Sequence, residues 1–182
     1  MGVTPLHHIA MTCSVGFAML LICARADACP EISPIKLTDV KYADSIVIGS
    51  ISNFRIVRDQ KFRDRMLSAP GLSKEERNLY RDGSTLMSDY ATFDLSVSKV
   101  LAGKVPARVR IKWRNASFGL PSRMNPGPFL VALAYPGSKK RTGLWDFESD
   151  AIAMLQGLCS NAFYFDVSSK EARVIIKLLG KR

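Results

Sequence analysis

The chain has 182 residues, a length that suits one domain, and its hydrophobic content of 47% is ordinary for a globular protein. Its 26 lysine and arginine residues exceed its 16 aspartate and glutamate residues, which gives a formal net charge of +10. A strongly basic domain can meet nucleic acid, anionic lipid, acidic polysaccharide or an acidic protein, although the charge can also serve solubility alone.

The N-terminal segment, residues 1–28, is predicted to be a secretory signal peptide. Residues 14–22 are apolar, and Ala26-Asp27-Ala28 matches a small-residue cleavage site, although no Lys or Arg precedes the apolar run. The run is shorter than the roughly 20 residues that a membrane span needs. We therefore expect an exported protein, periplasmic or secreted, that begins at Cys29. A lipid anchor on Cys29 is not favoured, because Ala26 stands where a branched apolar residue would be required.

Removal of this segment takes away both histidines, His7 and His8. The mature chain then contains no histidine. It cannot form a Ser-His-Asp or Cys-His catalytic site, an imidazole general base or a His-ligated zinc site. The acids Asp146, Glu148 and Asp150 lack the glycine and terminal glutamate of a calcium loop, so no metal is expected. No other spacing singles out a catalytic pair. We expect a protein that is not an enzyme and uses no cofactor.

Two cysteines remain in the mature chain, Cys29 and Cys159. Thiols in an oxidising compartment usually pair, so we expect a disulfide between them. In the chain-entropy description, closing such a long loop contributes on the order of 4–5 kcal/mol. The alternative is a pair of unlinked buried cysteines.

The predicted elements begin with a short helix or turn within residues 34–43 and a strand over residues 45–57. The apolar pattern of this strand is disturbed at Gly49, and a glycine inside a strand often marks a bulge or bend. A first strand bent there can take part in two sheets, as a closed small barrel requires. Residues 58–89 are predicted to be a charged, partly helical insertion, with a helix that Ser73 and Glu76 cap.

Residues 91–113 give the clearest pattern in the chain. Apolar and polar residues alternate on both sides of a break at Gly103, which predicts an antiparallel hairpin with one buried and one solvent-exposed face. The cations expected on the exposed face of its second strand are Arg108, Arg110, Lys112 and Arg114.

The remaining elements follow in order. Residues 115–127 form a Gly/Pro-rich loop that carries Phe118 and is either an ordinary connection or a recognition loop. Residues 129–135 are continuously apolar and bounded by prolines, which predicts a buried central strand. Residues 168–181 are predicted to be a closing helix capped by Ser168. Its apolar stripe, expected to face the core, comprises Ala172, Ile175, Ile176 and Leu179.

Several short motifs recur in a familiar order. They are Cys29, residues 43–49 (ADSIVIG), 92–97 (TFDLSV), 99–103 (KVLAG), 127–131 (GPFLV) and 159–161 (CSN). Together they resemble the barrel domain of tissue inhibitors of metalloproteinases and their netrin-module relatives, especially the short exported bacterial versions. The resemblance covers roughly residues 29–165. It implies a mainly β fold, a five-stranded OB-like barrel with a short helical insertion and a C-terminal helix, in a single domain over residues 29–182.

The resemblance also suggests where a partner would bind. The animal inhibitors insert their N-terminal cysteine into a metalloproteinase site, and the matching residue here is Cys29. The candidate partner edge comprises Cys29, Pro30 and Phe118.

Two functions are therefore expected. The first is a non-catalytic exported module that binds a protein partner, of which protease inhibition is one narrow version. The alternative is a basic module that binds nucleic acid or acidic polysaccharide, because alternate residues of the cationic strand lie about 6.6–6.8 Å apart and can face phosphates or uronates. Steep salt dependence would distinguish polyanion binding from an apolar protein interface. We expect a monomer with no membrane span in the mature chain.

Overall fold

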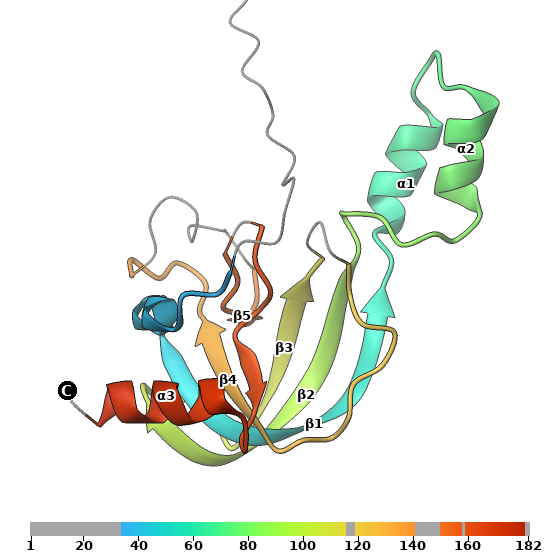
Figure 1. Ribbon diagram of the computed structural model, residues 1–182. Coiled ribbons are helices and arrows are strands. Elements are labelled where there is room, and N and C mark those ends of the chain that lie inside the picture. Colours follow the sequence, from blue (N-terminus) through green and yellow to red (C-terminus); the bar gives the residue numbers. More distant parts are fainter. Residues whose placement is uncertain (1–33, 116–118, 141–149, 158, 181–182) are drawn as a thin grey trace, which may run out of the picture.

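The computed structural model describes residues 34–115, 119–140, 150–157 and 159–180 (Figure 1). The helices of these residues are the 3-10 helix η1 (Leu37–Tyr42), α1 (Gln60–Leu67), α2 (Lys74–Arg81) and α3 (Lys170–Leu179). The strands are β1 (Ser45–Val57), β2 (Tyr90–Ala102), β3 (Arg108–Arg114), β4 (Phe129–Ala134), β5 (Ala153–Met154) and β6 (Tyr164–Asp166). None of the helices in the described part of the chain is long and apolar enough to cross a membrane.

The strands form a closed barrel. The sheet order is β1-β2-β3-β5-β4-β6, and an additional pairing of β1 with β4 closes the first five of these into a ring. Strands β3 and β5 run parallel, whereas the other paired strands run antiparallel. The predicted mainly β fold with an OB-like barrel is therefore confirmed. The two short strands β5 and β6 were not predicted.

Strand β1 closes the barrel because it serves two neighbours. It pairs with β2 along almost its whole length and with β4 through Ser45–Gly49. The register with β2 shifts between Ile48 and Gly49, and a Cβ on Gly49 would lie only 2.6 Å from the carbonyl oxygen of Ser96. A side chain cannot occupy that space, so glycine lets the two backbones approach closely where the strand bends. The bend predicted at Gly49 is confirmed.

The predicted hairpin forms from β2 and β3. Phe93 pairs with Ile111 across the two strands, and both side chains are fully buried inside the barrel together with Leu95. Trp113 points to the same interior and is only 6% exposed. The turn between the strands uses Gly103 at φ +77°, a conformation that favours glycine. The alternate residues of both strands consequently face outward.

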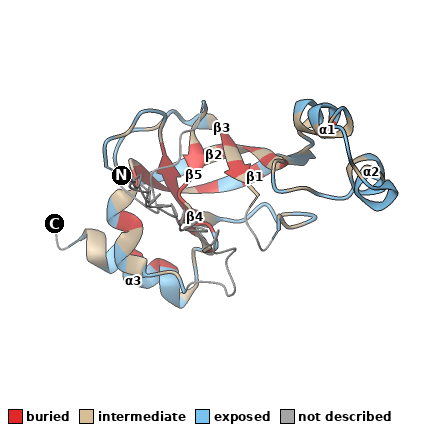
Figure 2. Cartoon of the chain, turned by 90° about the horizontal axis from the view of Figure 1, so that it is seen from above, coloured by how far each residue is buried: buried red, intermediate tan, exposed pale blue. Residues whose placement is uncertain are grey.

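Helix α3 covers a second apolar cluster outside the barrel (Figure 2). Ala172 and Ile175 are fully buried there, as predicted, whereas Ile176 is 38% exposed and is not a core residue. The predicted cap was also wrong by one residue. Ser169 accepts the N-cap hydrogen bond from the Ala172 amide, because Ser168 instead donates to the Asp166 carboxylate.

Residues 60–81, which we call the helical arm, project away from the barrel between β1 and β2 (Figures 1 and 2). Helix α2 carries the predicted capping box of Ser73 and Glu76. Helix α1 was missed, although its N-cap Asp59 accepts a hydrogen bond from the Phe62 amide. Two helices of eight residues each are too short to be stable on their own in water, so contacts at the base of the arm must stabilise them.

Replacing Gly49 tests the role of the close approach. We expect Gly49→Ala to lower the free energy of unfolding by about 1–3 kcal/mol, because the new Cβ meets backbone that cannot move without disturbing the β1–β2 pairing. Urea unfolding followed by circular dichroism measures the change. Gly180→Ala is the matched control, since its nearest neighbour would lie 3.7 Å away. Equal stability of Gly49→Ala and the wild type would contradict this account.

Candidate functional site

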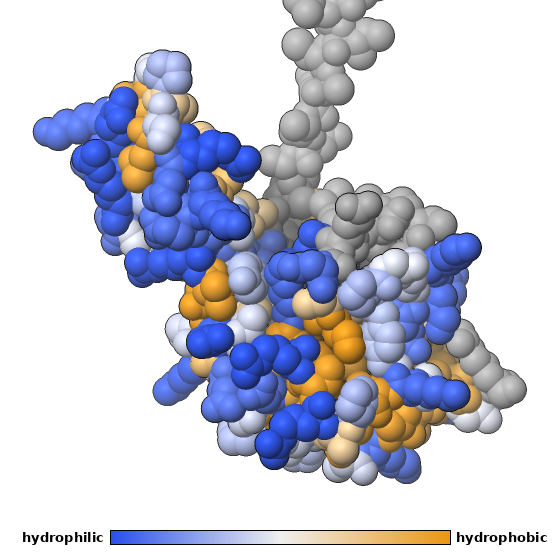
Figure 3. All heavy atoms as spheres, turned by 180° about the vertical axis from the view of Figure 1, so that it is seen from behind, coloured by the Kyte–Doolittle hydropathy of each residue, from blue (hydrophilic) through white to orange (hydrophobic). Residues whose placement is uncertain are grey.

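The outward residues of the β1–β3 sheet form a surface that we call the basic face. It comprises Arg55 from β1, Tyr90, Thr92, Asp94 and Ser96 from β2, and Arg108, Arg110, Lys112 and Arg114 from β3. All four cations predicted on the second strand of the hairpin belong to it. Seen from the side on which β2 and β3 lie, hydrophilic side chains surround a hydrophobic area of the barrel (Figure 3).

The register places a different partner opposite each of the four β3 cations. Arg108 faces Ser96, Arg110 faces Asp94, Lys112 faces Thr92 and Arg114 faces Tyr90. Arg55 on β1 reaches the same surface, where its Nε donates to the Thr92 hydroxyl over 3.4 Å. Because the intervening β3 residues Ile111 and Trp113 are buried, the barrel holds the row of cations in a fixed orientation.

Asp94 is the carboxylate at the centre of the basic face. Arg110 donates two hydrogen bonds to it, of 2.8 and 3.1 Å, and Asn53 donates a third of 2.7 Å. The hydrogen bonds from Arg110 and then from Asn53 lower the pKa of Asp94 from 3.8 to about 2. The same contact raises the pKa of Arg110. At neutral pH, Asp94 is therefore ionised and offsets the charge of Arg110.

Lys112 lies between an acid and an aromatic ring. Its Nζ is 2.8 Å from a carboxylate oxygen of Asp150, which precedes β5, and 4.6 Å from the ring centroid of Tyr90. The hydrogen bond from Lys112 is the main reason why the pKa of Asp150 is lowered. The side chain of Asp150 is 81% exposed, so solvent and salt screen this pair strongly.

Tyr90, like Arg55, is a residue of this face that was not predicted from the sequence. Tyr90 lies two residues before the outward-facing Thr92 in the same strand, so the alternation of β2 also predicts that Tyr90 faces outward. Trp113 of β3, in contrast, packs inside the barrel against Tyr164, with ring centroids 5.1 Å apart. Among the described residues, the five cations of the basic face meet one carboxylate on the face, that of Asp94, and one beside it, that of Asp150, which leaves an excess of positive charge.

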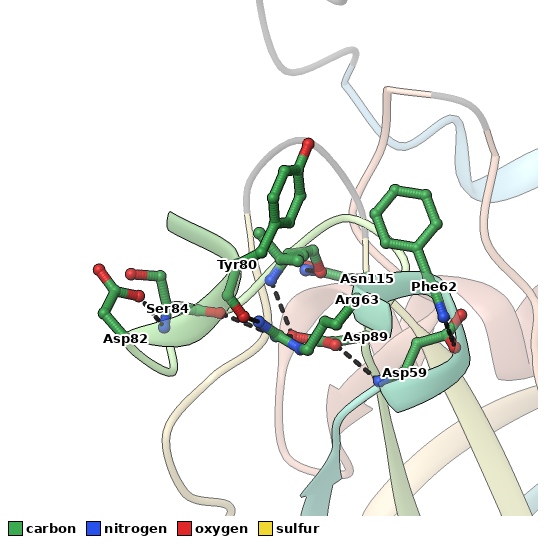
Figure 4. A network of polar contacts seen from close by, with 9 residues as sticks. Asp59, Phe62, Arg63, Tyr80, Asp82, Ser84, Asp89 and Asn115 are labelled. Carbon is green, nitrogen blue, oxygen red and sulfur yellow. Dashed lines mark hydrogen bonds and ion pairs between the residues drawn. The ribbon is translucent and has the colours of Figure 1, made fainter. Parts of the chain in front are cut away.

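A buried ion pair joins the helical arm to the barrel beside this face (Figure 4). Arg63 of α1 lies 2.6 Å from Asp89, and their side chains are 2% and 0% exposed. The guanidinium of Arg63 also donates to the carbonyl oxygen of Ser84 over 2.9 Å. Asp89 accepts two further hydrogen bonds of 2.8 Å, from the amides of Asp59 and Leu86.

This pair organises the whole base of the arm. Arg63 reaches the carbonyl of Tyr80 at the end of α2 as well, so one guanidinium contacts both the second helix and the returning chain. Phe62 and Tyr80 pack edge to face at 6.3 Å between the two helices. Asn115, directly after β3, donates to the Leu86 carbonyl and links the base of the arm to the end of the hairpin. A charge-assisted network of this kind orients the arm more specifically than its few apolar contacts can.

The other predicted site residues have separate outcomes. Cys29, Pro30 and Phe118 lie outside the described residues, so the candidate partner edge stays a prediction. Cys159 is disulfide-bonded and adopts φ +61°, but its pairing with Cys29 also stays a prediction. Asp146 and Glu148 lie outside the described residues too. In the described part of the chain, no group of three His, Cys, Asp or Glu residues is placed to hold a metal ion.

We expect Arg63→Ala to release the helical arm while the barrel stays folded. Removing one partner of a buried pair costs about 3–5 kcal/mol, so opening of the arm should increase by about 100-fold or more. Limited proteolysis should then cut within residues 60–84, and hydrogen exchange should remain slow in β2 and β3. Lys61→Ala, on the exposed side of the same helix, is the control. Equal loss of protection in the arm and the barrel would show that the arm is not a separate unit.

The pKa of Asp94 provides a second test. An NMR titration should find this carboxyl titrating near pH 2, and Arg110→Gln should raise its pKa towards 3.8. Asp166, whose pKa is lowered by Ser168, should not respond to Arg110→Gln. Because the folded-state pKa of Asp94 is depressed, this group stabilises the fold above its unfolded-state pKa and loses that effect as the pH falls through about 2. Titration of wild-type Asp94 near 3.8 would contradict its hydrogen bonds to Arg110 and Asn53.

No family model, curated protein or solved structure matches this chain. The resemblance to inhibitors of metalloproteinases and netrin modules therefore stays a prediction from the sequence, and the function proposed for the chain rests on the geometry of its described residues.

Proposed function

We propose that this protein is an exported, non-catalytic binding module and that its basic face holds a polyanion. The observation that supports this proposal most is the row of outward cations on β3, flanked by Arg55 and aligned by the closed barrel. Export rests on the predicted signal peptide, residues 1–28. The face lies where OB barrels commonly bind oligonucleotides and oligosaccharides, on the second and third strands.

The spacing of the cations suits an extended ligand. Alternate residues of a strand lie about 6.6–6.8 Å apart, so Arg108 to Arg114 span about 20 Å in a straight line. A chain of phosphates, sulfates or carboxylates laid along β3 can contact these cations one after another. The strand is held by buried neighbours, so little backbone freedom is lost when the ligand binds.

The acids on the face are compatible with this role. Exposed ion pairs contribute little to stability, and a ligand anion can replace a carboxylate partner without leaving a buried charge unpaired. Lys112 meets this condition best, because its partner Asp150 is 81% exposed. Asp94 is held more firmly by Arg110 and Asn53, so it limits the affinity of the face for anions.

A protein partner is the second candidate. The helical arm projects from the barrel, and the apolar side chains of Leu79 and Met87 on the arm and its return are 45% and 61% exposed. An inhibitor-like mode would depend on Cys29, Pro30 and Phe118. Such an interface would be apolar and less sensitive to salt than the basic face.

Salt-dependent binding tests the first proposal. The mature protein should bind a fluorescent single-stranded oligonucleotide or labelled heparin, with log K falling linearly as log salt concentration rises. The triple variant Arg108→Ala, Arg110→Ala, Arg114→Ala should lower the slope for the oligonucleotide by about 1.4, since Arg108 and Arg114 each lose a phosphate contact that contributes about 0.7, whereas Arg110 is already offset by Asp94. The matched control removes three cations from α3, on the other side of the molecule, as Lys170→Ala, Arg173→Ala, Lys177→Ala. Equal loss of binding in both triple variants would mean that binding depends on the net charge of the protein and not on the basic face.

Neutralising Asp94 should act in the opposite direction. Asp94→Asn removes the carboxylate that pairs with Arg110. We therefore expect tighter binding of the oligonucleotide and a salt dependence whose slope is about 0.7 steeper. Glu171→Gln changes the net charge equally on α3 and should leave binding nearly unchanged. Weaker binding by Asp94→Asn would mean that Arg110 does not face the ligand.

A further inference from the structure

Tyr90 occupies a distinctive place on the basic face. It is the first residue of β2, lies opposite Arg114 and shares its outward parity with Thr92 and Asp94. Its side chain is neither buried in the barrel nor fully exposed. Asp89, which anchors the helical arm, immediately precedes it, so the ring stands where the cationic row meets the base of the arm.

One cation lies over this ring, and a second is its neighbour on the adjacent strand. The Lys112 ammonium lies 4.6 Å from the ring centroid, and Arg114 is the cross-strand neighbour of Tyr90. A cation over an aromatic face is attracted to the ring, which holds the ring and the ammonium in a defined geometry. The basic face thus presents both elements of a mixed site, namely a line of cations and an aromatic ring within that line.

This combination distinguishes between classes of polyanion. Proteins that hold single-stranded nucleic acid combine a positive groove for the backbone with aromatic side chains on which bases stack. Acidic polysaccharides and polyphosphate have no planar aromatic base to place on a ring. The bases of a duplex are already stacked on one another and would have to be unpaired first.

We propose that the basic face binds single-stranded nucleic acid, with the phosphates along the β3 cations and a base stacked on Tyr90. This inference rests on the proposed polyanion function and names its ligand class. The Lys112 ammonium supports one side of the ring and also contacts the backbone, while the opposite side of the ring receives the base.

The experiment compares four probes of the mature protein at fixed salt. They are a single-stranded oligothymidylate, an abasic strand of the same length, a duplex of the same length and heparin. We expect the oligothymidylate to bind tighter than the abasic strand by about 5- to 150-fold, the range that one stacked base provides. The duplex should bind more weakly than the oligothymidylate.

Variants of Tyr90 make the test specific. Tyr90→Ala should lose the preference for the oligothymidylate and keep its affinity for the abasic strand, which also shows that the variant is folded. Tyr90→Phe should retain the preference, because stacking needs the ring and not the hydroxyl. Tyr42→Ala is the matched control, since Lys41 lies 4.9 Å from that ring centroid on η1. It should behave as the wild type.

The outcomes separate the two proposals. If no probe binds in a salt-dependent way, the polyanion function itself is wrong. If the abasic strand or heparin binds as tightly as the oligothymidylate, the polyanion function stands and the inference about nucleic acid is wrong. A preference for bases that survives in Tyr90→Ala would likewise overturn the role of this ring.

Discussion

The closing of the barrel at Gly49 is the constraint on which the rest of the structure depends. Because a side chain at this position would meet the Ser96 carbonyl at 2.6 Å, glycine alone lets β1 bend closely against β2 and still pair with β4. Closure aligns β2 and β3, buries Phe93, Leu95 and Ile111, and forces the intervening residues outward. The basic face is thus a consequence of the fold, since the same alternation that fills the core sets out the cations.

Carboxylates on and beside the basic face lower the positive charge that it presents to a ligand. Asp94 is held by three hydrogen bonds and stays ionised to about pH 2, so it balances Arg110 permanently at neutral pH. Asp150 is exposed, so an anion of the ligand can replace it as the partner of Lys112. The buried pair of Arg63 and Asp89 has a different role, because it is fully removed from water and anchors the helical arm at one end of the face.

Much of this arrangement could be predicted from the sequence, and the failures have physical causes. The two-residue period of the hairpin and the glycine in β1 each have one simple structural interpretation, so they were predicted correctly. Strands β5 and β6 contain two and three residues, too few to establish a period. Helix α1 has few apolar residues, and the contact that stabilises it, Arg63 to Asp89, joins residues far apart in the sequence. Tyr90 precedes residues 91–113, in which the alternation is clearest, so its outward position was not predicted.

NMR mapping of a bound polyanion tests the central claim most directly. A short oligonucleotide added to the ¹⁵N-labelled protein without its predicted signal peptide should shift amide signals of residues 90–98 and 108–114, with the side-chain Nε of Arg108 among them. Amides of α3 should not move. Shifts confined to α3 or to the helical arm, or the absence of any shift in the barrel, would contradict a ligand-binding role for the basic face.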